Sequence, residues 1–155
     1  MKPTALARIV SGGQTGVDRA ALDVALALGF ECGGWCPKGR RAEDGAIDRR
    51  YPLVESETDA YAERTRLNVR DSDGSLILTR GRPTGGTALT LTLARTLGRP
   101  SMVVDLAAAA APAPDEVAAW IAAAGIRVLN IAGPRESTAP GIRDEAAAFL
   151  RKVLA

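Results

Sequence analysis

The stretch Ile9-Val10-Ser11-Gly12-Gly13-Gln14-Thr15-Gly16-Val17-Asp18 constrains the fold most, because an apolar strand runs through a glycine-rich turn directly into a helix. The pattern predicts a strand over Leu6–Val10 and a helix over Val17–Leu28, with Arg19 off its apolar stripe and Gly29 at its end. The N-terminus of such a helix presents free N–H groups and the positive end of the helix dipole, so it is suited to an anion such as phosphate. A tight turn without a ligand is the alternative, since the glycine spacing is neither the dinucleotide fingerprint nor the Walker motif.

The same arrangement occurs twice more along the chain. A strand over Ser75–Thr79 leads into the turn Arg80-Gly81-Arg82-Pro83-Thr84-Gly85-Gly86-Thr87 and a helix over Ala88–Leu97. A last strand over Ile126–Ala132 leads through Gly133-Pro134-Arg135-Glu136-Ser137 into a helix over Pro140–Leu154. If the strands are parallel, all three turns meet at the carboxyl edge of one sheet, where α/β sheets bind their ligands.

The remaining segments continue this alternation. Strands are expected over Phe30–Trp35 and Ser101–Asp105, a helix from an N-cap at Asp59 to Val69, and a helix from an N-cap at Asp115 to Ala124. Apolar runs such as Leu76-Ile77-Leu78 are typical of strands that are covered on both faces. The sequence therefore predicts one domain over residues 1–155, a Rossmann-like three-layer α/β/α sandwich around a central parallel sheet of about five strands.

Composition excludes several classes of function. The chain has 155 residues, a net charge of +2, two cysteines and no histidine, so a four-ligand Cys/His zinc site and a His-based triad are excluded. With balanced charge and 4% aromatic residues, nucleic-acid binding is not expected. No apolar run is long enough to span a bilayer, and no apolar signal region follows Met1, so we expect a cytoplasmic protein without membrane contact.

Three further features leave alternatives open. The long charged loop Pro37–Gly45, which contains Lys38, is either functional or a solvated surface loop. Asp71 and Asp73 could hold a cation or act as acid and base, although an Asx-turn explains them equally well. Cys32 and Cys36 could bind a soft metal, but in this setting they are better read as small apolar residues, and no metal site is predicted.

Four separated motifs carry a resemblance to a known family. They are Ser11-Gly12-Gly13-Gln14-Thr15-Gly16-Val17-Asp18, Gly34-Trp35-Cys36-Pro37-Lys38-Gly39-Arg40, Asn68-Val69-Arg70-Asp71-Ser72-Asp73-Gly74 and Thr84-Gly85-Gly86-Thr87. In this order they resemble the bacterial putative molybdenum (cofactor) carrier family, over the chain up to about Asp105. The resemblance implies the molybdenum cofactor (molybdopterin) as bound ligand.

That family is similar to a Rossmann-like superfamily that includes the lysine-decarboxylase-like cytokinin phosphoribohydrolases and the DNA-processing protein of transformation. These relatives imply a nucleotide-like ligand. The phosphoribohydrolases carry a Pro-Gly-Gly-x-Gly-Thr-x-x-Glu motif, and the similar place here reads Thr84-Gly85-Gly86-Thr87-Ala88-Leu89-Thr90. The match implies phosphate binding at Gly85, Gly86 and Thr87, whereas the catalytic glutamate is not matched.

The sequence thus predicts a protein that binds a phosphorylated pterin or nucleotide-like ligand, as a molybdenum cofactor carrier rather than an enzyme. The alternative is a nucleotide-phosphate hydrolase. The expected ligand-binding residues are Gly12, Gly13, Gln14, Thr15, Gly16, Asp18, Lys38, Arg82, Thr84, Gly85, Gly86 and Thr87. Asp18 either complements the helix dipole or accepts hydrogen bonds from the ligand, and Arg82 would neutralise phosphate. The expected partners are a small phosphorylated ligand and further copies of the chain in a homo-oligomer.

Overall fold

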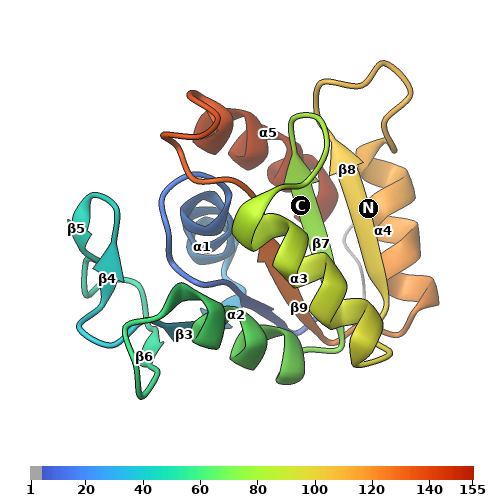
Figure 1. The fold of residues 1–155 in the computed structure, drawn as a ribbon. Helices are drawn as coiled ribbons and strands as arrows, with labels where there is room; N and C mark the ends of the chain where they lie inside the picture. Colours follow the sequence, from blue (N-terminus) through green and yellow to red (C-terminus); the bar gives the residue numbers. More distant parts are fainter. Residues whose placement is uncertain (1–4) are drawn as a thin grey trace.

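A central sheet of five parallel strands forms the middle layer of the protein, as seen in a computed structural model that describes residues 5–155 (Figure 1). From one edge to the other the strands are β2 (Glu31–Gly33), β1 (Arg8–Val10), β9 (Val128–Ala132), β7 (Gly74–Thr79) and β8 (Ser101–Asp105). Every neighbouring pair is parallel. The predicted parallel sheet of about five strands is confirmed.

Helices cover both faces of this sheet. On one face lie α1 (Val17–Leu28), α5 (Ile142–Leu154) and α4 (Pro114–Ala123), with α5 packed between the other two; on the opposite face α2 (Tyr61–Arg70) packs against α3 (Gly85–Thr96) (Figure 1). The three-layer Rossmann-like sandwich is therefore confirmed. The expected homo-oligomer stays a prediction.

The core follows the apolar runs of the sequence. All six residues of β7 are buried, and Leu76, Ile77 and Leu78 are fully so, as expected for a strand between two helical layers. One prediction for α1 is wrong, because Arg19 is buried rather than on a polar face. Its guanidinium donates to the Gly13 carbonyl at 3.0 and 3.1 Å and pairs with Asp44 at 2.9 Å, so its charge and hydrogen bonds are satisfied inside the protein.

Several element boundaries differ from the predicted ones. Neither Asp59 nor Asp115 is an N-cap: α2 follows Ala60, and α4 starts one residue earlier than Asp115, at Pro114. Proline suits the first helical position because its fixed φ is already helical and it has no N–H to satisfy. The strand expected over Phe30–Trp35 ends at Gly33, after which β3 (Trp35–Cys36) pairs with β6 (Val54–Glu55) in a separate small sheet.

The long charged loop is ordered by internal hydrogen bonds. Arg40 donates from its guanidinium to four backbone carbonyls, at 2.8 to 3.3 Å, those of Ile47, Asp48, Tyr51 and Leu53. Part of the loop forms an antiparallel hairpin of β4 (Arg41–Ala42) and β5 (Gly45–Ala46), which projects beside α1 and α2 (Figure 1). The hairpin was not predicted, because two-residue strands give no hydrophobic periodicity.

The topology brings the three strand-to-helix turns to one edge, as predicted. From β1 the chain passes through α1 outward to β2, and from β7 it passes through α3 outward to β8 in the opposite direction, while β9 lies between β1 and β7. Such a divergence leaves a crevice at the carboxyl ends of the strands. None of the helices within residues 5–155 is long and apolar enough to cross a membrane. Residues 1–4, where no signal region was expected, lie outside the described part.

The first and third turns approach each other so closely that one of them needs glycine. Gly16 has a φ of +78°, and a Cβ on it would lie 2.3 Å from the Pro134 carbonyl oxygen, the atom that accepts the Val17 N–H at 3.3 Å.

Gly16→Ala should therefore lower the free energy of unfolding by about 3 kcal/mol or more, combining left-handed strain with a backbone clash. Gly39→Ala is the matched control, because Gly39 has a φ of +82° with nothing within 4 Å of its would-be Cβ. It should cost only about 1–2 kcal/mol of strain. Urea denaturation of both variants measures the difference, and equal losses would contradict the tight contact between the turns.

Candidate functional site

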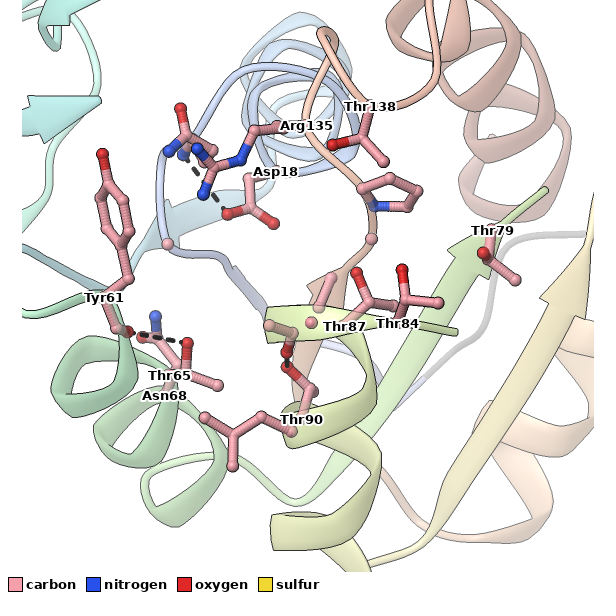
Figure 2. Close-up of a pocket in the computed structure, with 18 of the residues that line it drawn as sticks. Asp18, Tyr61, Thr65, Asn68, Thr79, Thr84, Thr87, Thr90, Arg135 and Thr138 are labelled. Carbon is pink, nitrogen blue, oxygen red and sulfur yellow. Dashed lines mark hydrogen bonds between the residues drawn. The ribbon is translucent and has the colours of Figure 1, made fainter. Parts of the chain in front are cut away.

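A cavity of about 530 Å³ opens at the carboxyl edge of the sheet (Figure 2). Its walls are the turns after β1, β7 and β9, the first turn of α3 and one side of α2. This volume falls within the range of about 300–1,000 Å³ that small-molecule sites occupy. The cavity therefore lies where the divergence of the strand connections predicts a ligand site.

Eight of the twelve predicted site residues line this cavity. They are Gly12, Gln14, Asp18, Arg82, Thr84, Gly85, Gly86 and Thr87. The other four, Gly13, Thr15, Gly16 and Lys38, do not line it. Lys38 is exposed in the loop before the hairpin, and its backbone N–H donates to the Thr58 carbonyl at 2.9 Å.

The first glycine turn is filled by the protein's own groups. A Cβ on Gly12 would lie 1.9 Å from an Arg64 guanidinium nitrogen, and one on Gly13 would lie 2.5 Å from the Leu53 side chain. The Thr15 hydroxyl donates to Glu43 and accepts the Glu136 N–H at 3.1 Å. Glycine is thus required here for contacts within the protein, and the predicted phosphate cradle is not an open backbone surface at this turn.

Asp18 occupies the N-terminus of α1 with a buried carboxylate. Its Oδ2 accepts the Gln14 N–H at 3.3 Å and pairs with the Arg64 guanidinium at 3.3 Å, while Arg64 also donates to the Gly12 carbonyl at 2.6 Å. Burial raises the pKa of Asp18 above the ordinary aspartate value, although Arg64, the Gln14 N–H, Arg19 and Arg135 all act to lower it. A carboxylate in this environment is a strong hydrogen-bond acceptor and also a candidate proton carrier.

The N-terminus of α5 is closed by a carboxylate. The Glu136 carboxylate accepts the N–H groups of Gly141 at 2.5 Å and of Arg143 at 3.1 Å. In the same turn, Ser137 donates to Glu43 from its hydroxyl at 2.5 Å and from its N–H at 3.2 Å. Two of the three helices that begin at the cavity edge therefore carry an internal carboxylate at their N-terminus.

The N-terminus of α3 is open. Thr84 is its N-cap residue without a side-chain cap, its first turn contains no acidic residue, and the backbone N–H groups of Gly85 and Gly86 have no acceptor anywhere in residues 5–155. Would-be Cβ atoms on both glycines meet nothing within 4 Å. Figure 2 shows Thr84 and Thr87 side by side at this end of the helix, across the cavity from Asp18 and Arg135. This helix end thus has the exposed N–H groups that suit an anion.

The arginines of the cavity edge have different roles. Arg80 is held by the Pro140 carbonyl at 2.7 Å and by Glu145 at 3.3 Å, so it is part of the structure. Arg82 is exposed and has neither a hydrogen bond nor an ion pair within the described chain. Arg135 makes an ion pair of only 3.9 Å with Glu43 and lies 5.1 Å from the Tyr61 ring centre. Arg82 is therefore the cation that is free to meet an anionic ligand, whereas Arg135 is held only loosely by Glu43.

Hydroxyl groups dominate the rest of the cavity wall. Thr79 ends β7, Thr65 lies on α2, and Thr87 and Thr90 lie on α3 (Figure 2). Among them, Thr65 and Thr90 donate to the Tyr61 and Gly86 carbonyls. A wall of this composition is uncharged but offers hydrogen bonds, as expected around a polar ligand.

Sequence reasoning named no ligand-binding residue on α2 or in the third turn. Tyr61, Arg64 and Asn68 share one side of α2 at helical spacing, a polar side that the sequence already displays. Asn68 holds α2 in place, because its side-chain oxygen accepts the Trp35 N–H at 2.8 Å and its amide donates to the Trp35 carbonyl at 3.0 Å. The polar side of α2 is visible in the sequence, but only the fold shows that this side faces the cavity.

The other predicted candidates have structural explanations. Asp73 accepts the Arg127 and Val128 N–H groups at 3.1 and 2.9 Å, before the start of β7 and at the edge opposite the cavity. Asp71 binds the Trp35 indole and Arg70, whose hydrogen bond holds the pKa of Asp71 below the ordinary value. Cys32 and Cys36 are buried and unbridged, and burial raises the pKa of both thiols. Among residues 5–155, no cluster of three or more potential ligands could hold a metal ion.

Fold and cavity together define a Rossmann-like α/β protein with a polar cleft at the switch of strand order. The family described as "Circularly permutated YpsA SLOG family" matches the chain over residues 9–154, so the protein belongs to this family. It is similar to a crystal structure at 1.45 Å resolution, "Putative molybdenum carrier protein" from Syntrophus aciditrophicus SB, with 43% identity, a TM-score of 0.93, and coverage of 100% of this chain and 98% of that chain. The comparison with curated proteins gave no match. The family resemblance drawn from the four motifs is confirmed.

The raised pKa of Asp18 predicts a defined pH dependence of stability. Its folded pKa lies above the value of about 3.9 of an exposed aspartate, so between these values the native state binds more protons than the unfolded state. This stabilising contribution is complete below about pH 3.9 and is lost as pH rises through the folded pKa.

Asp18→Asn removes this titration. The free energy of unfolding of the wild type minus that of the variant should therefore fall as pH rises through the folded pKa of Asp18. Urea denaturation at a series of pH values measures it. The loss of the Arg64 ion pair does not disturb the comparison, because arginine stays charged throughout. A difference that rises with pH would mean that pairing with Arg64 outweighs burial.

Proposed function

We propose that the protein binds a small phosphorylated ligand, a pterin or a nucleotide-like molecule, with its phosphate at the N-terminus of α3. The observation that carries this proposal is the open helix end: the N–H groups of Gly85 and Gly86 and the side chain of Arg82 have no partner within the described chain. Backbone N–H donors, a helix dipole and a guanidinium together suit phosphate oxygens.

Asp18 determines how the proposed ligand is oriented in the cavity. A carboxylate repels phosphate, so the anionic group is favoured on the α3 wall and a hydrogen-bond donor is favoured on the Asp18 wall. Figure 2 shows these two walls facing each other across the cavity. The ligand that fits is therefore anionic at one end and carries a polar, donor-bearing group at the other.

A carrier of the molybdenum cofactor fits this arrangement, and two observations support it. The similar protein from Syntrophus aciditrophicus SB bears the name of a molybdenum carrier. The cavity offers hydrogen-bond donors for a phosphate, and residues 5–155 contain no cluster of side chains that could hold a metal ion directly. The cofactor supplies its own dithiolene sulfurs to molybdenum, so the protein needs to hold only its phosphate and pterin. Gly85, Gly86, Thr84 and Arg82 would hold the phosphate, and Asp18 the pterin.

A nucleotide-phosphate hydrolase is the second candidate function, and Asp18 is the observation that favours it. Glycosidic hydrolysis needs a carboxylate near the sugar, and general acid–base help is worth roughly a hundredfold to ten-thousandfold. The glutamate of the related phosphoribohydrolases is not matched near Thr90, but Asp18 points into the cavity with a raised pKa (Figure 2). It is the group that could take over this role.

Thr84→Asp tests the phosphate site. It gives α3 the internal carboxylate that α1 and α5 already have, so it should raise the free energy of unfolding by about 0.5–1 kcal/mol. By occupying the open N–H groups it should also weaken binding of a nucleoside monophosphate at least about tenfold, as measured by calorimetry.

The control is Thr92→Asp, the same substitution on an exposed side chain of the same helix away from the cavity. It should leave the affinity unchanged and slightly reduce stability, because aspartate is a poor former of helix interiors. Unchanged affinity in Thr84→Asp would remove the α3 end from the site.

Incubation with nucleoside monophosphates separates carrier from enzyme. A carrier should bind them and release no free base over hours, as checked by chromatography, while native mass spectrometry of protein from its own host should show a bound ligand. Base release that disappears in Asp18→Asn, with the fold intact by thermal melting, would establish the hydrolase instead.

A further inference from the structure

The cavity has a second polar end around Gln14, Asp18 and Arg135. We propose that this end is a subsite for the cyclic-amide edge of the ligand's ring, a carbonyl oxygen next to a ring N–H. This inference rests on the proposed function, because it concerns the part of the same ligand that lies away from the phosphate. It follows from a count of hydrogen-bonding groups that the protein itself leaves unsatisfied.

Gln14 contributes a buried donor. Its side-chain oxygen accepts the N–H groups of Thr15 at 3.0 Å and of Glu43 at 2.9 Å, which fixes the orientation of the amide. The amide nitrogen therefore points the other way, and nothing within residues 5–155 accepts from it, although the residue is only 4% exposed and lines the cavity. A buried donor left without an acceptor is unfavourable, so a bound ligand gains by supplying one.

Asp18 contributes an acceptor. Its Oδ2 already takes the Gln14 N–H and the Arg64 guanidinium, whereas its Oδ1 receives no hydrogen bond from any described residue. The carboxylate points into the cavity (Figure 2). The group that meets it must therefore be a donor.

Arg135 contributes further donors. Its guanidinium lies beside Asp18 in Figure 2 and lines the cavity, yet it makes no hydrogen bond in the described structure, and its paired carboxylate, Glu43, is 3.9 Å away. Tyr61 lies under it at 5.1 Å and limits its position. Its free N–H groups are next to the same end of the ligand.

The ratio of these groups selects the chemistry of the ring. Gln14 Nε2 and the Arg135 guanidinium are two donor groups without an acceptor in the described chain, and Asp18 Oδ1 is an acceptor atom without a donor. A carbonyl oxygen has two lone pairs, one for each donor group, and the neighbouring ring N–H meets the acceptor atom, so a cyclic amide can contact all three groups. The edge of adenine has the reverse ratio, with one ring-nitrogen lone pair and an amino group with two hydrogens. Oxo-purines and pterins carry the matching edge.

Calorimetry of the wild type with a set of related ligands tests the subsite. Inosine monophosphate should bind at least about tenfold more tightly than adenosine monophosphate and than N1-methylinosine monophosphate, which has a methyl group in place of the ring hydrogen. Ribose 5-phosphate measures the phosphate end alone, and inosine and adenosine measure the ring end without phosphate.

Exchanging the carboxylate and the amide supplies a second test. In the double variant Gln14→Glu/Asp18→Asn the net charge is unchanged, and the oxygens that accept the Thr15, Glu43 and Gln14 N–H groups are retained. The donor and the acceptor toward the ligand are exchanged, so the preference for inosine monophosphate should fall at least about tenfold relative to adenosine monophosphate. Glu63→Gln, on a partly exposed residue of α2 that pairs with Arg66 and does not line the cavity, is the control and should leave this preference unchanged.

The outcomes separate the two proposals. Equal affinity for the inosine and adenosine compounds, with ribose 5-phosphate still bound, would overturn the subsite and leave the phosphate site standing. If inosine binds as tightly as its monophosphate, the phosphate site fails, while a preference for inosine over adenosine still supports the subsite. No binding of any of these ligands at millimolar concentration would overturn both.

Discussion

The ion pair between Asp18 and Arg64 connects the two helical layers at the carboxyl edge of the sheet. Asp18 lies on α1 and Arg64 on α2, on opposite faces, and both side chains are about nine-tenths buried. The Arg64 guanidinium also donates to the Gly12 carbonyl, in the space that a Cβ on Gly12 would fill. Breaking a buried pair of this kind by removing one partner typically costs about 3–5 kcal/mol, because the other charge stays buried. The position of α2, and with it one wall of the cavity, depends on this contact.

The three helices that start at the cavity edge each follow a strand of the central sheet, but their N-termini differ in chemistry. Asp18 lies in the first turn of α1 and accepts the Gln14 N–H just before the helix, whereas Glu136 accepts N–H groups at the start of α5. The α3 turn carries Thr84, Gly85 and Gly86 in the corresponding place and has no acidic residue in its first turn. The proposed location of the anion site therefore follows from which helix start lacks a carboxylate, and the number of glycines in each turn does not decide it.

The sequence was sufficient for the sheet, its layers and the meeting of the three turns, because buried parallel strands such as β7 leave long apolar runs. It also placed Arg82, Gly85 and Gly86 in a turn at this edge, where they line the cavity. It was insufficient for the first turn, because glycines that admit Arg64, Leu53 or the Pro134 carbonyl look the same in sequence as glycines that admit a ligand. Arg64 and Arg135 were missed for a related reason: their partners are 46 and 92 residues away in the chain.

The chain contains no histidine, and this gives the buried position of Asp18 an additional consequence. The pKa values of Glu43, Asp44, Glu63 and Asp71 are shifted downward, away from neutrality, whereas that of Asp18 is shifted upward. Among these five carboxyl groups, the one whose pKa is shifted upward lies at the cavity wall, and no imidazole titrates beside it. The carboxyl stretch of Asp18 in the infrared spectrum can thus serve as an intrinsic, label-free reporter of what occupies the cavity.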